Sequence, residues 1–266
     1  MSILRPFLTQ SWRKDEFSDS LLGQSCSGNI MNTTKQHISH QFDEEMEHLR
    51  HQVLKMGGMV EQQIKGSLDA LQDMNAEGAD QIVLRDHQVN ALEVAIDEEC
   101  MRILAKRQPT ASDLRMVVAV IKTITDLERI GDEAEKIAKM ALHLTDMDNI
   151  FHKRYNGIRH LGDYVTQMVH DALDAYARQD VNAALKVVRD DEEADSQYQD
   201  LVRMFMTYMM EDSRKITEVL DVIWTARSLE RIGDHAKNIG EYVIYLVKGK
   251  DIRHLDLQSI EEKILT

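Results

Sequence analysis

One short sequence occurs twice in this chain of 266 residues, and it constrains the fold more than any other feature. The segment Asp126-Leu-Glu-Arg-Ile-Gly-Asp132 returns 102 residues later as Ser228-Leu-Glu-Arg-Ile-Gly-Asp234. Residues 121–137 and 223–239 share ten identities in 17 positions, and residues 56–70 match 161–175 at an offset of 105. A repeat of this length indicates that one structural unit is duplicated.

Each copy is predicted to contain three long helices. Apolar residues recur at spacings of three and four, the helical period, and past Pro6 the only proline is Pro109. We therefore predict an all-α fold with six long helices, arranged as two repeated antiparallel three-helix bundles. The helices are expected at about 42–73, 80–106, 112–144 with a cap at Ser112 or Asp113, 155–178, 181–209 and 214–248.

The expected domains are repeats at 37–146 and 151–250, with a C-terminal tail at 251–266. Residues 1–36 are rich in Ser and Gly and lack helical periodicity, which predicts a disordered extension, with Met31 a candidate native start. Charged residues such as Arg13 and Asp15 stand where a signal peptide needs its apolar core. No segment approaches the roughly 18 apolar residues of a membrane span.

Charge and cysteine content exclude several classes of protein. The 46 acidic and 32 basic side chains give a net charge of −14, which argues against nucleic-acid binding, because phosphates require clustered Lys and Arg. Two cysteines, Cys26 and Cys100, cannot form a disulfide framework or a multi-thiolate zinc site. A reducing compartment, the cytoplasm, is therefore expected.

The repeated segments place two carboxylates one helical turn apart. Glu128 and Asp132, like Glu230 and Asp234, are four residues apart and so share one helix face. At about 100° per residue, both pairs continue the apolar stripe of their helix and are predicted to face inward. Buried anions need partners, because desolvating them is unfavourable.

More acids are predicted opposite these pairs. If the chain folds back at residues 108–109, Asp86, Asn90 and Glu93 come level with Glu128 and Asp132. In the second repeat Asp191 and Asp195 occupy the equivalent positions, level with Glu230 and Asp234. Carboxylate and amide oxygens suit Mg²⁺, Mn²⁺ or iron, so the sequence predicts one metal site in each repeat.

Two other interpretations of the acids remain open. They can pair with arginines across the helices, or they can face a solvated groove. The candidate arginines are Arg85, Arg129, Arg189 and Arg231. Gly131 and Gly233 stand between the acids, and a close approach of helices would explain both with or without metal.

A carboxylate-bridged metal enzyme is the alternative function. Ferritin-like di-iron proteins need two Glu-x-x-His motifs on their helices, and this chain has one there, Glu45-x-x-His48, far from the repeated segment. His235 directly follows Asp234 and so points to a different side of the helix, and its counterpart in the first repeat is Glu133. We therefore expect His235 to lie on the surface. No glycine-rich phosphate loop or zinc-protease motif is present.

These motifs resemble those of the PhoU family of phosphate transport regulators, in its proteobacterial form. The resemblance covers about residues 37–250 and rests on four strings besides the repeated acids. They are Met56-Gly-Gly-Met-Val-Glu61, Ala105-Lys-Arg-Gln-Pro-Thr-Ala-Ser-Asp-Leu-Arg115, Tyr208-Met-Met-Glu-Asp-Ser213 and Ala226-Arg-Ser-Leu-Glu-Arg-Ile-Gly-Asp-His235.

The resemblance implies a cytoplasmic, non-enzymatic homodimer that represses the phosphate-starvation regulon. Its implied partners are the ATPase of the phosphate ABC transporter and a membrane-bound sensor histidine kinase, so that it meets the membrane only through partners. It also implies Mg, Mn, Fe or Zn bound by Glu128, Asp132, Glu230 and Asp234, with Asp86, Asp191 and Asp195 opposite. Asn90 departs from the family's acidic pattern.

Overall fold

The described part of the chain is built from six α-helices and one short 3₁₀ helix, as expected for an all-α fold. The computed structural model describes residues 28–109, 111–145, 156–253, 255 and 259–260. The helices are α1 (Gly28–Asp73), α2 (Ala76–Arg107), α3 (Ala111–Thr145), α4 (Asn156–Arg178), α5 (Val181–Glu211) and α6 (Ile216–Lys248), with η2 (Ser213–Lys215) before α6. None of these helices is long and apolar enough to cross a membrane.

The first helix begins earlier than predicted. It starts at Gly28 and not near residue 42, so residues 28–36, which the sequence analysis placed in the N-terminal extension, are part of α1. This polar stretch lacks an apolar stripe, but extending a formed helix requires only one further backbone hydrogen bond per residue. Residues 1–27 lie outside the described part. Residues 1–41 form one unit and residues 42–266 another, and the rest of the description concerns the second.

Local capping groups set several helix ends. The side chain of Asn75 accepts a hydrogen bond from the backbone N–H of Gly78 at 3.0 Å, which fixes the start of α2. Asp180 does the same for α5 through the N–H groups of Asn182 and Ala183. Gly249 ends α6 in a left-handed conformation, with φ of 67°.

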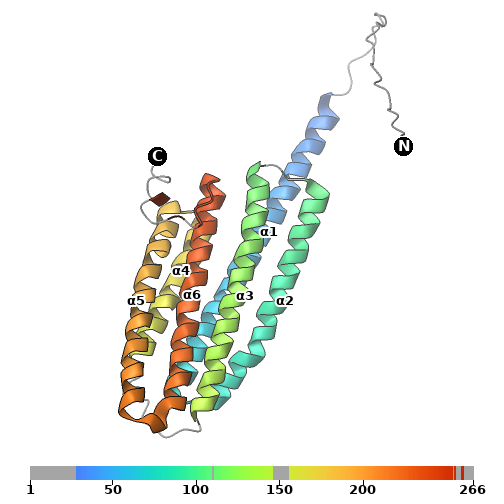
Figure 1. The fold of residues 1–266 in the computed structure, drawn as a ribbon. Coiled ribbons are helices and arrows are strands. Elements are labelled where there is room, and N and C mark those ends of the chain that lie inside the picture. Colours follow the sequence, from blue (N-terminus) through green and yellow to red (C-terminus); the bar gives the residue numbers. More distant parts are fainter. Residues whose placement is uncertain (1–27, 110, 146–155, 254, 256–258, 261–266) are drawn as a thin grey trace, which may run out of the picture. The chain divides into compact units, whose positions relative to one another are not determined.

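In the 42–266 unit, α3 and α6 lie side by side between α2 and α5 and run in opposite directions (Figure 1). The α1 and α4 helices meet through reciprocal contacts. A Cβ atom added at Gly57 would lie 2.6 Å from Leu173, and one added at Gly162 would lie 2.7 Å from Leu68. Because these residues are equivalent in the two repeats, the repeats pack about an approximate two-fold axis.

The segment after α6 is attached to the bundle. The side chains of Ile252 and Ile260 are 1% and 2% exposed and belong to the same hydrophobic core as the helices. The sequence predicted only a tail from residue 251, because two isolated apolar residues carry no periodic signal.

Two glycines in long helices should respond in opposite ways to substitution. A Cβ at Gly240 of α6 would lie 3.0 Å from the backbone oxygen of Ala184 in α5, whereas nothing lies within 4 Å of one at Gly58. We expect Gly240→Leu to lower the free energy of unfolding by about 1–3 kcal/mol through overpacking. Gly58→Ala should raise it by about 0.5–1 kcal/mol. Urea denaturation measures both, and equal effects would contradict the close approach of α5 and α6.

Candidate functional site

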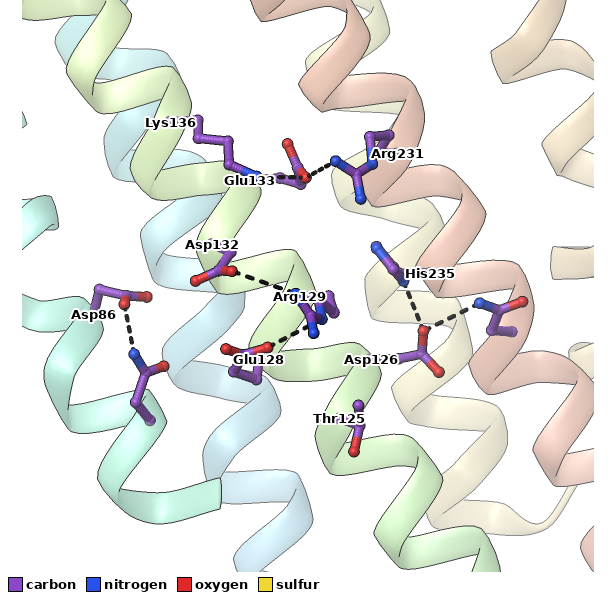
Figure 2. Close-up of polar contacts among 12 residues, drawn as sticks. Asp86, Thr125, Asp126, Glu128, Arg129, Asp132, Glu133, Lys136, Arg231 and His235 are labelled. Carbon is purple, nitrogen blue, oxygen red and sulfur yellow. Dashed lines mark hydrogen bonds and ion pairs between the residues drawn. The ribbon is translucent and has the colours of Figure 1, made fainter. Parts of the chain in front are cut away.

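The predicted ligands of the first repeat gather on the facing sides of α2 and α3. This first acidic face consists of Asp86, Asn90 and Glu93 on α2 with Glu128 and Asp132 on α3, most of which Figure 2 labels. Asn90 Nδ2 donates a hydrogen bond to Asp86 Oδ2 at 3.0 Å. The first repeat therefore brings together the five residues that the sequence proposed.

Gly131 allows the carboxylate of Asp86 to approach the backbone of α3. A Cβ at this position would lie 3.2 Å from Asp86 Oδ1 and 3.2 Å from Gln63 Oε1. Gln63 comes from α1, is 3% exposed, and its Nε2 donates to Asp86 Oδ1 at 3.4 Å. Sequence reasoning missed Gln63, because nothing in the repeat marks a glutamine of the first helix.

Burial and mutual repulsion raise the pKa values of three carboxyl groups on the first acidic face. The pKa of Asp86 rises through burial and then through the charges of Glu135 and Asp132. The pKa of Glu128 rises through burial and then through Asp132 and Glu93. Burial also raises the pKa of Glu93. These carboxyl groups hold their protons more strongly than in water, mainly because they are buried and secondarily because like charges lie nearby.

One arginine offsets part of this charge. Arg129 Nε lies 3.5 Å from Glu128 Oε2, and its Nη1 lies 4.0 Å from Asp132 Oδ2 (Figure 2). The arginine side chain is 56% exposed, so these contacts are screened and contribute little stability. Arg129 thus contacts acids of its own helix, α3, which differs from the predicted pairing of arginines with these acids across the helices.

The second acidic face joins Asp191 and Asp195 of α5 to Glu230 and Asp234 of α6. Burial, followed by the charge of Asp234, raises the pKa of Glu230 to about 7. Burial followed by Asp191 raises the pKa values of Asp234 and Asp195. The equivalence predicted from the repeat thus holds for the placement of the acids.

Two cations already bind the acids of the second face. Lys237 Nζ donates to Asp191 Oδ2 at 2.6 Å, and Arg227 donates to Glu230 Oε1. Burial alone would lower the pKa of Lys237, but the Asp191 carboxylate raises it. Neither cation was predicted, because the repeat analysis followed the acids and not the residues that differ between the copies.

The oxygen donors of both faces suit a hard divalent cation such as Mg²⁺ or Mn²⁺. Gln63 Oε1, Asn90 Oδ1 and Glu230 Oε2 are buried and have no hydrogen-bond partner among the described residues. In the described part of the chain, no three His, Cys, Asp or Glu side chains are already grouped as a metal site. A cation would therefore draw the carboxylates together through side-chain rotation.

The two repeats also meet through buried charges that the sequence did not suggest. Asp126 and Glu133 lie two turns apart on α3 and face α6 (Figure 2). Asp126 Oδ1 contacts His235 Nδ1 at 2.7 Å and accepts from Asn238 at 3.1 Å. His235 was expected on the surface, and that expectation is wrong: its side chain is 15% exposed. The seven-residue spacing of the two acids was the available signal.

Glu133 is the most deeply buried carboxylate of this interface between repeats. Arg231 Nη1 of α6 lies 2.7 Å from Glu133 Oε1, and Lys136 Nζ lies 2.9 Å from the same oxygen. Glu133 is 2% exposed. We call the contacts of Asp126 and Glu133 with α6 the inter-repeat seam.

Glu45, the acid of the single helical Glu-x-x-His motif, is held by arginines. Arg107 donates to it through two nitrogens, at 3.0 and 3.1 Å, and Arg102 lies 3.6 Å away. These pairs lower the pKa of Glu45, the Arg107 hydrogen bond most of all. Glu45 therefore forms ion pairs that connect α1 to α2.

Comparison with known proteins identifies both repeats. Residues 53–141 and 158–243 each match the PhoU domain. The chain is 49% identical over 228 residues to the phosphate-specific transport system accessory protein PhoU homolog of Pseudomonas aeruginosa, covering 86% of this chain and 94% of that protein. It is 49% identical over 226 residues to PhoU of Escherichia coli (strain K12), covering 85% of this chain and 93% of that protein.

Solved structures show the same fold. The crystal structure of PhoU from Pseudomonas aeruginosa aligns with a TM-score of 0.74 at 48% identity, covering 79% of this chain and all of that one. The phosphate transport system regulatory protein PhoU from Streptococcus pneumoniae aligns with a TM-score of 0.72 at 30% identity, covering 79% of this chain and 98% of that one.

Proposed function

Because the chain belongs to the PhoU family, with both PhoU domains present, we propose that it is a regulatory accessory protein of phosphate transport. Its role is to repress the phosphate-starvation regulon when phosphate is plentiful and to modulate phosphate uptake. The names of the relatives describe accessory and regulatory proteins, which fits a protein that is not an enzyme. The match over both repeats is the observation that carries this proposal.

The proposed mode of action is that of an adaptor. The protein acts in the cytoplasm, as a homodimer, between the ATPase subunit of the phosphate ABC transporter and the cytoplasmic part of a sensor histidine kinase. Long rigid helices with a net charge of −14 favour docking through extended surfaces and disfavour nucleic acid as a partner. The di-iron enzyme alternative gains no support, because Glu45 is engaged by Arg107 and Arg102.

Cation binding by the acidic faces is part of the proposal. Glu128, Asp132, Glu230 and Asp234 are the main proposed ligands, with the α2 and α5 acids opposite. Two observations support it: the buried Gln63 Oε1 has no hydrogen-bond partner, and the pKa of Glu128 is raised by burial and then by the charges of Asp132 and Glu93. A bound Mg²⁺, Mn²⁺, Fe or Zn ion would supply positive charge and stiffen the helices as a docking surface.

The test combines partner binding with repression. The purified chain should bind the cytoplasmic domain of the sensor kinase in solution, and binding should tighten with Mn²⁺ and weaken with a chelator. Glu128→Gln/Asp132→Asn should lose the cation effect, whereas Glu77→Gln/Asp80→Asn, which removes two exposed acids of α2, should keep it. In cells, the chain should restore repression of a phosphate-starvation reporter in a strain that lacks its own PhoU.

Each result has a distinct meaning. No binding to the kinase and no restored repression would reject the adaptor proposal. Binding and repression that are unchanged in Glu128→Gln/Asp132→Asn would leave the adaptor in place and remove the cation from its mechanism.

A further inference from the structure

The two acidic faces occupy equivalent positions but differ in charge. Lys237 in the second repeat stands where the first has Glu135. Lys237 binds Asp191 at 2.6 Å. Glu135 has its own counterion in Lys139, at 2.6 Å, but its charge still raises the pKa of Asp86, the residue equivalent to Asp191. Glu135 and Lys139 of the first repeat are thus reversed to Lys237 and Glu241 in the second, and the reversal brings the cation to Asp191.

Two further differences act in the same direction. Arg227 of the second repeat replaces Thr125 of the first, and it donates to Glu230. Tyr198 takes the place of Glu93, and the Arg227 guanidinium carbon lies 5.9 Å from the centre of its ring. Asp195 in place of Asn90 acts in the opposite direction. With Glu135 counted as part of the first face, the second face therefore has one carboxylate fewer and two cations more than the first at equivalent positions.

The first face has an oxygen donor that the second lacks. Gln63 is 97% buried, its Oε1 has no hydrogen-bond partner in the described part of the chain, and it is directed at Gly131 between the acids. Met168 occupies the equivalent position in the second repeat and presents a methyl group to Gly233. A buried neutral amide oxygen beside carboxylates is a ligand type that hard divalent cations use.

The surroundings of the second face are also basic. A cavity of about 470 Å³ opens here, and its lining includes the cations Arg231, Lys237 and Arg253 together with the acids Asp234 and Glu241. Glu230 Oε2 is unpartnered, but the same carboxylate is already bound by Arg227. A divalent cation entering here would meet the repulsion of these basic side chains and would have to displace Lys237 from Asp191.

From these differences we infer that the chain holds one divalent cation per molecule, in the first acidic face, while Lys237 and Arg227 act as built-in counterions of the second face. The inference rests on the proposed cation binding and restricts it to the first repeat, which removes Glu230 and Asp234 from the set of ligands. The second repeat then keeps its acidic face closed by internal ion pairs, independent of metal supply, so the two halves of the protein respond differently to divalent cations.

Exchanging the differing residues between the repeats tests the inference. Wild-type protein freed of metal with a chelator is titrated with Mn²⁺ by calorimetry, and bound Mn is counted by elemental analysis after gel filtration. We expect one Mn²⁺ per chain. Glu135→Lys should weaken binding on the order of a hundredfold, and Arg227→Thr/Lys237→Glu should create a second site of similar affinity.

A milder variant and matched controls accompany these changes. Gln63→Met, which copies residue 168, should weaken binding on the order of tenfold and keeps the test valid if Glu135→Lys fails to fold. Glu98→Lys matches the charge change of Glu135→Lys, and Lys248→Glu matches that of the Lys237→Glu substitution. Both lie at exposed positions and should leave one site of unchanged affinity. Circular dichroism checks that each variant is helical.

The outcomes separate this inference from the proposed function. Two equal sites in the wild type, or no second site in Arg227→Thr/Lys237→Glu, would overturn the assignment to one repeat and leave cation binding intact. No binding of Mn²⁺ or Mg²⁺ to the wild type would overturn cation binding itself and the inference with it. Loss of binding in Glu135→Lys and Gln63→Met, with a gain in the second repeat, would establish the inference.

Discussion

Arg231→Ala/Lys136→Ala is expected to lower the free energy of unfolding by about 3–5 kcal/mol. Both cations bind Glu133 Oε1, at 2.7 and 2.9 Å, and the carboxylate is 2% exposed. Removing them leaves a buried charge without a partner, which costs more than the ion pairs contribute. Urea denaturation at neutral pH, followed by circular dichroism, measures the change.

The control for this loss of stability removes the unpaired charge of Glu133. Adding Glu133→Gln to the double variant should recover most of the stability, because a neutral amide is far less costly to bury than a carboxylate. A loss below about 1 kcal/mol in the double variant, or no recovery in the triple variant, would mean that the buried Glu133 does not depend on Arg231 and Lys136.

The second large effect concerns Glu230 and pH. The pKa of this carboxyl is raised from 4.5 to about 7 by burial and by the charge of Asp234. Below pH 4.5 the group is protonated in both folded and unfolded chains. Its full contribution to the free energy of unfolding is therefore present there. As pH rises through about 7, the folded chain must ionise a buried group, and about 3 kcal/mol of stability is lost from the metal-free protein.

Glu230→Gln should therefore unfold at higher urea concentration than wild type at pH 8 in the presence of a chelator, and at about the same concentration at pH 4.5. Glu98→Gln removes one exposed carboxyl and should follow the wild type across the range. A variant that is no more stable than wild type at pH 8 would show that Arg227 already compensates the ionised carboxylate.

The helices and the acids were readable from the sequence, because both follow from periodicity and repetition. A stripe of apolar residues fixes which face of a helix is buried, and a fold-back at residues 108–109 then places Asp86 opposite Asp132. These inferences use one helix or one hairpin at a time. The repeat extended them to α5 and α6 without further assumptions.

The contacts between repeats could not be read in this way. His235 and Asp126 are 109 residues apart, and their pairing depends on how α3 and α6 pack. The role of Lys237 was missed for another reason. The repeat analysis used positions that are identical in both copies, whereas Lys237 differs from its counterpart, Glu135, which has the opposite charge.

The reciprocal contacts of Gly57 with Leu173 and of Gly162 with Leu68 have a consequence for divergence. Two separate copies of one unit, joined in the same way, would carry every substitution twice, once on each side of the axis. Glu133 and His235 would then be a single position, unable to be a buried acid on one side and a ring that binds Asp126 on the other. Tandem fusion removes this constraint and lets each half acquire chemistry of its own.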